Sequence, residues 1–289
     1  MSQPRLALVS YGCPTFVSAD DALSVPALTE AGFVVSFVSW DDPSVPWTQF
    51  EVVVLRSCWD YHERYREFVS WLERLDLATA RLINPARSIV WNANKRYLLD
   101  LQRRGVRIVP THYLNDGELP SRELLRRLGF SQAVIKPAIS ASAAHTELVS
   151  ESTIGAIALP RGQQWIVQRF VSSITHQGEW SLIFFNGVYS HAVLKKPRSG
   201  DFRVQSALGG SWEPCTASTQ MVEFASRVLR AVDDDLTYAR VDCVVDGDDI
   251  ALMELEIIEP SLFFQADTAA PGRFAHAISQ RAAAQRGSV

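Results

Sequence analysis

Two turn sequences in the second half of this 289-residue chain restrict its fold more than any other feature. Asn186-Gly187 and the tetrapeptide Asp246-Gly247-Asp248-Asp249 each separate two apolar runs that have the length of strands. The four runs are Glu179–Phe185, Val188–Leu194, Tyr238–Val245 and Ile250–Ile257. Asn-Gly and Asp-Gly between such runs are the strongest short-range signals for a β-hairpin. The second half is therefore predicted to be α+β with antiparallel sheets.

The first 88 residues show a different pattern, in which short apolar runs alternate with helical periodicity. Strands are expected at Leu6–Val9, Phe33–Val38 and Val52–Leu55, and helices from Asp20 to Gly32 and at Arg64–Leu75. In the last of these, apolar residues recur at the i, i+3, i+4, i+7 spacing of one helix face. This alternation predicts an α/β domain with a parallel sheet and helices on its faces.

The elements between these two regions complete a three-domain division. We expect an N-terminal domain at 1–88, a central subdomain at 89–166 and a C-terminal subdomain at 167–289. The further elements expected are helices at Asn94–Arg104, Ser121–Leu128 and Ser218–Ala231, and strands at Val106–Val109, Ala133–Lys136 and Trp165–Phe170.

Composition narrows the class of protein. The net charge is −4 and the pI about 5.9, without the basic footprint of a nucleic-acid-binding protein. No apolar stretch reaches the roughly 18 residues of a membrane span, and no secretory segment opens the sequence. The four cysteines are far apart and form no CxxC pair, which argues against a zinc site or a disulfide framework. These features predict a cytoplasmic protein.

Three carboxylates meet on the second hairpin. Residues two apart on a strand share a face, so Glu254 and Glu256 lie together, as do Arg240 and Asp242. A three-residue loop at Gly247–Asp249 would place Asp242 directly opposite Glu254. Like charges in that position are destabilising, and a divalent cation such as magnesium or manganese would neutralise them. The alternative is that these carboxylates form a solvated outer face.

Two lysines and one arginine could hold an anion. Lys136 ends an apolar strand and precedes the small-residue run Ala138–Ala144, in which backbone N–H groups could approach a phosphate. Lys95 lies where a helix is expected to begin, a place that favours anions. Arg203 follows a basic stretch, and its planar guanidinium suits a phosphate or a carboxylate. In isolation, Lys136 would more simply be a lysine that snorkels at a strand end, and the charged loop that contains Arg203 would simply be solvated.

The order of these motifs resembles the ATP-grasp superfamily over about residues 84–265. The motifs are Lys95, Lys136-Pro137, Val167-Gln168-Arg169-Phe170, Gly178-Glu179, Asp201-Phe202-Arg203, Arg240-Val241-Asp242 and Met253-Glu254-Leu255-Glu256. The stretch from Lys195-Lys196 to Gly209-Gly210 is similar to the ribosomal-protein glutamate ligase branch.

The resemblance implies a role for each matching position. Phosphates of ATP would be bound by Lys95 and Lys136, and the ribose by Glu179. Lys195 would also belong to the ATP-binding site. Arg203 would be catalytic and would also contact substrate. The adenine would lie beside a hinge strand formed by Gln168, Arg169, Phe170 and Val171, and magnesium would be held by Asp242, Glu254 and Glu256.

The sequence also departs from the family pattern. Glu256 stands where asparagine is usual, so that either Glu256 or Glu259 could complete the metal site. Arg169 replaces a common glutamate. Ser140, Ser142 and His145 occupy a loop in which glycines are usual.

Two segments are similar to a small group that contains the cycloserine-forming ligase, which cyclises O-ureido-D-serine. They are Arg56-Ser57-Cys58-Trp59-Asp60-Tyr61 and the stretch from Glu254 to Phe264. Because ligands of open α/β sheets lie at the carboxyl ends of strands, we expect substrate contacts from Arg56, Trp59, Asp60 and Tyr61. Arg56 would hold a carboxylate and Asp60 an amino group. Alternatively, Asp60 belongs to a helix N-cap and Trp59 to the core.

The resulting hypothesis is an ATP- and magnesium-dependent carbon–nitrogen ligase that activates a carboxylate as an acyl phosphate, releasing ADP. Intramolecular cyclisation of O-ureido-D-serine is the favoured reaction. An intermolecular amino-acid or peptide ligase and an ATP-binding regulatory protein without chemistry are the alternatives. The retained lysines, arginine and carboxylates argue against the regulator. The expected partner is a small amino-acid-like substrate, and a homodimer remains an open alternative.

Overall fold

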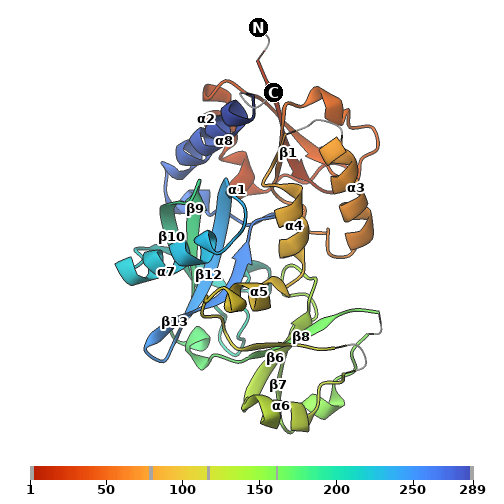
Figure 1. Ribbon diagram of the computed structural model, residues 1–289. Helices are drawn as coiled ribbons and strands as arrows, with labels where there is room; N and C mark the ends of the chain where they lie inside the picture. Colours follow the sequence, from red (N-terminus) through yellow and green to blue (C-terminus); the bar gives the residue numbers. More distant parts are fainter. Residues whose placement is uncertain (1–2, 78–80, 116–117, 161, 287–289) are drawn as a thin grey trace.

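The computed structural model describes residues 3–77, 81–115, 118–160 and 162–286, and its strands form three sheets (Figure 1). The N-terminal sheet is parallel, as predicted, and has the order β2-β1-β3-β4. Its strands are β1 (Arg5–Ser10), β2 (Val34–Ser39), β3 (Val52–Leu55) and β4 (Arg81–Ile83). Its helices are α1 (Ala19–Ala22), α2 (Val25–Glu30), α3 (Tyr65–Leu77) and α4 (Ala86–Ala93).

The single helix expected from Asp20 to Gly32 is in fact two short helices. Ser18 caps α1 by accepting a hydrogen bond from the Asp21 N–H group. Pro26 then lies in the first turn of α2, where its missing N–H group costs nothing, so a new helix begins there. The position of Asp20 and Asp21 on the separate helix α1 becomes important below.

The central sheet is antiparallel and has the order β5-β8-β6-β7. Its strands are β5 (Thr111–Tyr113), β6 (Gln132–Pro137), β7 (Glu147–Ser150) and β8 (Trp165–Arg169), and α5 (Tyr97–Arg103) and α6 (Arg122–Leu128) belong to the same region. The expected strand Val106–Val109 makes only one bridge, between Ile108 and Leu252. The domain boundary expected at 166/167 falls inside β8, so membership of this sheet extends to Arg169.

The C-terminal sheet is also antiparallel and has the order β11-β10-β9-β12-β13. Its strands are β9 (Glu179–Phe185), β10 (Val188–Lys196), β11 (Ser211–Cys215), β12 (Tyr238–Asp246) and β13 (Asp249–Glu256). Its helices are α7 (Thr219–Arg230) and α8 (Ala270–Arg286). Short 3₁₀ helices are η1 (Trp47–Gln49), η2 (Ile154–Ala156), η3 (Ser172–Thr175), η4 (Ser206–Leu208) and η5 (Phe264–Ala266).

Both predicted hairpins are present. Asn186 and Gly187 have φ values of 47° and 73°, the left-handed conformation that a two-residue turn between twisted strands requires. In the second hairpin Asp242 does pair with Glu254. The predicted three-residue loop is wrong, however, because Asp246 pairs with Asp249 and leaves two residues in the turn.

A β-bulge restores the predicted pairing. The register shifts between Asp242 and Cys243, which pair with Glu254 and Leu252, so that Met253 is the additional residue. A regular ladder from the two-residue turn would have placed Met253 opposite Asp242. The bulge therefore puts Glu254 and Glu256 on the face that carries Asp242.

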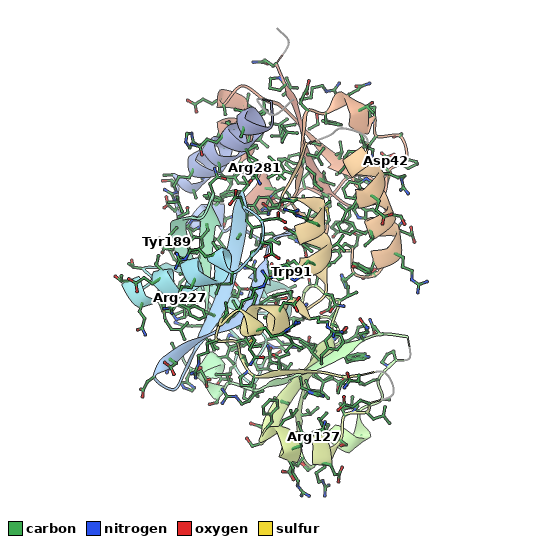
Figure 2. All side chains as sticks on the ribbon, in the orientation of Figure 1. Asp42, Trp91, Arg127, Tyr189, Arg227 and Arg281 are labelled. Atoms are coloured by element: carbon green, nitrogen blue, oxygen red, sulfur yellow. The ribbon has the colours of Figure 1, made fainter. Side chains whose placement is uncertain are left out.

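The N-terminal and C-terminal regions share one core. Helix α8 lies along α2 (Figure 1) and also contacts β4. In this region Phe274 and Ile278 pack with Leu6, Leu8 and Val54. Side chains also join the helices between the domains. Trp91, labelled in Figure 2, donates its indole N–H to Asp100 at 3.0 Å and so links α4 to α5. No helix in the described parts of the chain has both the length and the hydrophobicity needed to cross a bilayer.

Asn84 joins the N-terminal domain to the C-terminal sheet. This fully buried side chain donates to the carbonyls of Tyr238 and Ile257 at 3.0 and 2.9 Å, and accepts from the N–H group of Thr237 at 2.7 Å. Tyr238 is the first residue of β12, Thr237 directly precedes it, and Ile257 directly follows β13.

We predict that Asn84→Ala lowers the free energy of unfolding by about 3 kcal/mol, because buried backbone groups lose their partners. Denaturant titration would measure the change. The exposed Asn115→Ala is the control and should remain within about 0.5 kcal/mol of the wild type. Equal stability of the two variants would contradict a connecting role for Asn84.

Candidate active site

A cavity of about 440 Å³ is lined by all three regions of the chain. The N-terminal domain contributes Trp59 and Tyr61, and the central sheet contributes Lys136 and Gln168. The C-terminal sheet contributes most of the charged side chains, among them Asp242. This volume suits a small-molecule site. Most residues predicted from the sequence line it, namely Trp59, Tyr61, Lys95, Lys136, Gln168, Arg169, Phe170, Val171, Glu179, Lys195, Arg203, Asp242, Glu254 and Glu256.

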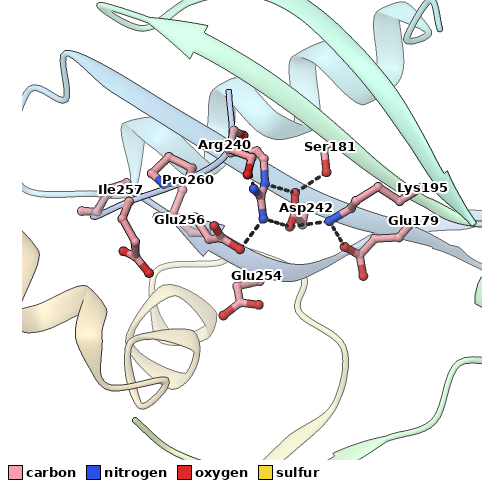
Figure 3. Close-up of polar contacts among 12 residues, drawn as sticks. Glu179, Ser181, Lys195, Arg240, Asp242, Glu254, Glu256, Ile257 and Pro260 are labelled. Carbon is pink, nitrogen blue, oxygen red and sulfur yellow. Dashed lines mark hydrogen bonds and ion pairs between the residues drawn. The ribbon is translucent and has the colours of Figure 1, made fainter. Parts of the chain in front are cut away.

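Asp242 is the most thoroughly bonded carboxylate in this cavity (Figure 3). It is 1% exposed. Arg240 donates to both of its oxygens at 2.9 Å, Lys195 Nζ donates to Oδ2 at 2.9 Å, and Ser181 donates to Oδ1 at 2.6 Å. Burial alone would raise the pKa of Asp242, but the charges of Arg240 and Lys195 hold it well below its usual range.

Register explains why these groups meet. Asp242 pairs with Ser181 on β9, and Lys195 on β10 pairs with Glu179, which shares a face with Ser181. Lys195 also forms an ion pair with Glu179. The sequence argument considered only an added divalent cation as the partner of Asp242, whereas Arg240 and Lys195 of the protein itself also lie beside it.

Glu254 and the two predicted phosphate lysines form a second group. Lys95 Nζ lies 3.2 Å from Glu254 Oε1 and donates to the Ser140 carbonyl at 2.7 Å. Lys95 is not helical, since it precedes α5 by two residues. Burial raises the pKa of Glu254, but Lys95 and Lys136 outweigh it and the net pKa is lowered. Burial lowers the pKa of Lys136, which has no ion pair within the described residues.

Glu256 and Glu259 lie where negative charge is poorly compensated. Burial raises the pKa of Glu256 to about 7, although Arg240 is its direct ion-pair partner. Burial, and next the charge of Glu256, raise the pKa of Glu259 to about 8. Each of these carboxylates would hold its charge more readily beside a further cation.

The predicted hinge and Arg203 are at the cavity wall. Gln168 donates to Thr111 at 3.0 Å and Arg169 pairs with Asp246. Phe170 packs edge-on against Phe202, with ring centroids 6.0 Å apart. Arg203 is about one-third exposed and is held by Asp201 at 2.9 Å.

Two predicted substrate residues lie outside the cavity lining. Arg56 is 2% exposed, pairs with Asp21 at 2.8 Å and donates to the Pro260 carbonyl at 2.9 Å. Asp60 accepts the indole N–H of Trp40 at 2.9 Å. Arg56 is covered because β3 ends inside the interface with the C-terminal region, and Arg56 is the first residue after β3.

Sequence reasoning missed the part played by Arg240 and Ser181. It noted that Arg240 and Asp242 share a strand face but assigned the arginine no role. An Arg-x-Asp spacing on a strand was the available signal, because the pair can bond directly. Ser181 carried no such signal, since its contact depends on the β9–β12 register.

The cavity residues fit a magnesium site in their chemistry, although the cluster is not preformed. Among the described residues, no three His, Cys, Asp or Glu side chains converge as metal ligands. Asp242 already accepts four hydrogen bonds. Glu254 and Glu256 are oxygen donors on one face, each with a single ion-pair partner, and fit a hard cation better.

Comparison with solved structures identifies the fold. The chain superposes on D-alanine–D-alanine ligase from Bacillus anthracis with a TM-score of 0.69 at 13% identity, covering 99% of both chains. It superposes on the ATP-grasp ligase PsnB with a TM-score of 0.65 at 14% identity, covering 96% of this chain and 98% of PsnB. The protein therefore has the fold of the ATP-grasp ligases.

More similar relatives identify the family. Residues 6–84 match the family described as "D-cycloserine synthetase DcsG, N-terminal domain". The cycloserine biosynthesis protein DcsG of Streptomyces lavendulae is 32% identical, covering 96% of this chain and 98% of that protein. The crystal structure of D-cycloserine synthetase DcsG aligns with a TM-score of 0.86 at 30% identity, covering 96% and 99% of the two chains. The chain therefore belongs to the D-cycloserine synthetase family.

The raised pKa of Glu259 predicts a pH-dependent stability. Between the ordinary pKa of a glutamate carboxyl group and about pH 8, Glu259 keeps its proton in the folded protein but releases it in the unfolded chain. The free energy of unfolding therefore falls as the pH rises through this range. We predict that Glu259→Gln raises the free energy of unfolding at pH 8 by about 1–3 kcal/mol and changes it little at pH 5. Urea titrations at both pH values, with the exposed Glu123→Gln as control, would test this. An equal effect at both would contradict it.

Proposed function

We propose that this enzyme closes the ring of D-cycloserine from O-ureido-D-serine, using ATP and magnesium. The observation that carries the proposal is that buried Lys95, Lys136 and Lys195 line the same cavity as Glu254 and Glu256. The lysines can neutralise phosphate groups and a substrate carboxylate, and the glutamates can neutralise a divalent cation. Membership of the D-cycloserine synthetase family supports the choice of product.

We assign the lysines to the phosphates and the acidic strand to the metal. Lys95, Lys136 and Lys195 would bind phosphate oxygens, and Glu254 and Glu256 would hold magnesium, with Asp242 fixing Arg240 and Lys195 beside them. Magnesium, when bound, neutralises the phosphate charge. Gln168 to Val171 would lie along the adenine and Glu179 near the ribose. Arg203, at the rim, would reach the transferred phosphoryl group if it exchanged Asp201 for that anion.

The chemistry proceeds by two displacements. The substrate carboxylate attacks the γ-phosphoryl group of ATP, giving an acyl phosphate and ADP. The nitrogen of the substrate's N–O bond then attacks the acyl carbon, phosphate leaves, and a five-membered ring forms. Hydrolysis of the ureido carbonyl consumes one water and releases carbon dioxide and ammonia. The protein mainly contributes positioning and charge stabilisation.

The reaction can be tested with single substrates. We predict that O-ureido-D-serine alone supports ADP formation in the presence of ATP and magnesium, with D-cycloserine and ADP produced in equal amounts. Coupled ADP detection and mass spectrometry would measure both. A requirement for a second amine would instead support an intermolecular ligase, and ATP binding without turnover would support a regulatory protein.

We predict that Glu254→Gln reduces turnover roughly 100- to 1,000-fold, because it removes one charge that holds the metal. Its melting temperature should stay close to that of the wild type, since Lys95 keeps its bond to the Ser140 carbonyl. Initial rates across magnesium concentrations, with Glu123→Gln as control, would check this. Near-normal turnover at limiting magnesium would remove Glu254 from the metal site.

A further inference from the structure

The loop that follows β13 is held by side chains from three other parts of the fold. We call residues 259–264 the clamped loop. Trp59 donates to the Glu259 carbonyl at 3.2 Å and Arg56 to the Pro260 carbonyl at 2.9 Å. Arg240 donates to the Ser261 carbonyl at 3.2 Å. A ring nitrogen of His191 bonds the Leu262 carbonyl at 2.9 Å.

The N–H groups of the same loop are bound by one carboxylate. Asp20 on α1 accepts from the N–H groups of Leu262, Phe263 and Phe264 at 2.9, 3.0 and 2.6 Å. Arg56 lies beside Asp20 through its ion pair with Asp21. The N-terminal domain, through Asp20, Arg56 and Trp59, thus holds much of the backbone of the clamped loop.

Glu259 is the acidic side chain that this loop presents to the cavity. Five carboxylates line the cavity in the described part of the chain: Glu179, Asp242, Glu254, Glu256 and Glu259. The first four each form an ion pair with Lys95, Lys195 or Arg240. Glu259 forms none with any described residue. A carboxyl group on a cavity wall that no protein cation neutralises suits a cationic ligand, whose positive charge would favour the ionised form of Glu259.

The position of Glu259 favours an ammonium group over a metal ion. Its backbone is bonded to Trp59, so it lies on the wall where Trp59 and Tyr61 of the N-terminal domain also face the cavity. Aromatic side chains beside a carboxylate suit an organic cation. In an α-amino acid the ammonium and carboxylate share one carbon atom. If the substrate carboxylate lies beside the phosphates of ATP, the ammonium group of the same substrate molecule therefore lies at a neighbouring wall of the cavity.

We infer that Glu259 binds the α-ammonium group of the substrate and selects amino acids over acids that lack the amine. This inference rests on the proposed function only for the identity of the amino acid. It assigns to Glu259 the contact that the sequence had suggested for Asp60, whose carboxylate is bonded to Trp40 instead.

The test compares matched ligands in calorimetry of the full chain saturated with ADP and magnesium. O-ureido-D-serine is paired with its analogue that lacks the amine, 3-(ureidooxy)propanoate, and D-alanine is paired with propanoate. We expect the wild type to bind the amino acid of at least one pair more tightly. Glu259→Gln should weaken that binding roughly 10- to 100-fold and leave the desamino acid unaffected. Glu259→Asp should recover part of the preference, and Glu123→Gln should match the wild type.

Three results would overturn the inference. The first is a wild type that shows no preference for the amine in either pair. The second is an equal loss for both members of a pair in Glu259→Gln, and the third is a raised magnesium requirement in that variant, which would make Glu259 a metal ligand. Preference for an amino acid without formation of D-cycloserine would contradict the proposed function while supporting the role of Glu259.

Discussion

The neutralisation of one buried carboxylate organises the cavity. Asp242 lies in the middle of the C-terminal sheet, where an isolated charge would be costly. Arg240 and Lys195 offset that cost from the same strand and from the next strand but one, and both then reach further acids, Glu256 and Glu179. The result is a chain of alternating charges across four strands. Its order comes from the pairing register of the sheet.

A second polar connection determines how the N-terminal domain takes part. Asp20 and Arg56 do not face the cavity, yet they bind the backbone of the clamped loop, which does. Arg56 is also fully enclosed, with its guanidinium over the rings of Tyr238 and Phe274. The domain that carries the family's N-terminal signature therefore acts on the site largely through backbone placement. Among its described residues, Trp59 and Tyr61 line the cavity directly.

The sequence was sufficient for features that depend on local pattern. Periodicity and turn residues identified the parallel first sheet and both hairpins, and motif order identified the lysines and the acidic strand. It failed where distant segments decide the outcome. Arg56 looked like a substrate residue because it follows a strand end, but the loop after β13 covers that end. Nor did the sequence indicate that Lys195 would form an ion pair with Asp242, because the approach of Lys195 depends on a strand pairing two strands away.

The bulge at Met253 makes the length of the turn independent of the sheet face that Glu254 and Glu256 occupy, two properties that are normally coupled in a hairpin. In a regular ladder, the length of the turn determines which face every later residue occupies. Here the extra residue lies between the turn and the acidic pair, so the turn can keep its compact two-residue form while Glu254 and Glu256 face the cavity. Turn length and bulge must therefore change together. A relative with one more residue in this turn should lack one residue before the first glutamate, so an insertion and a deletion would appear as a compensated pair within a single hairpin.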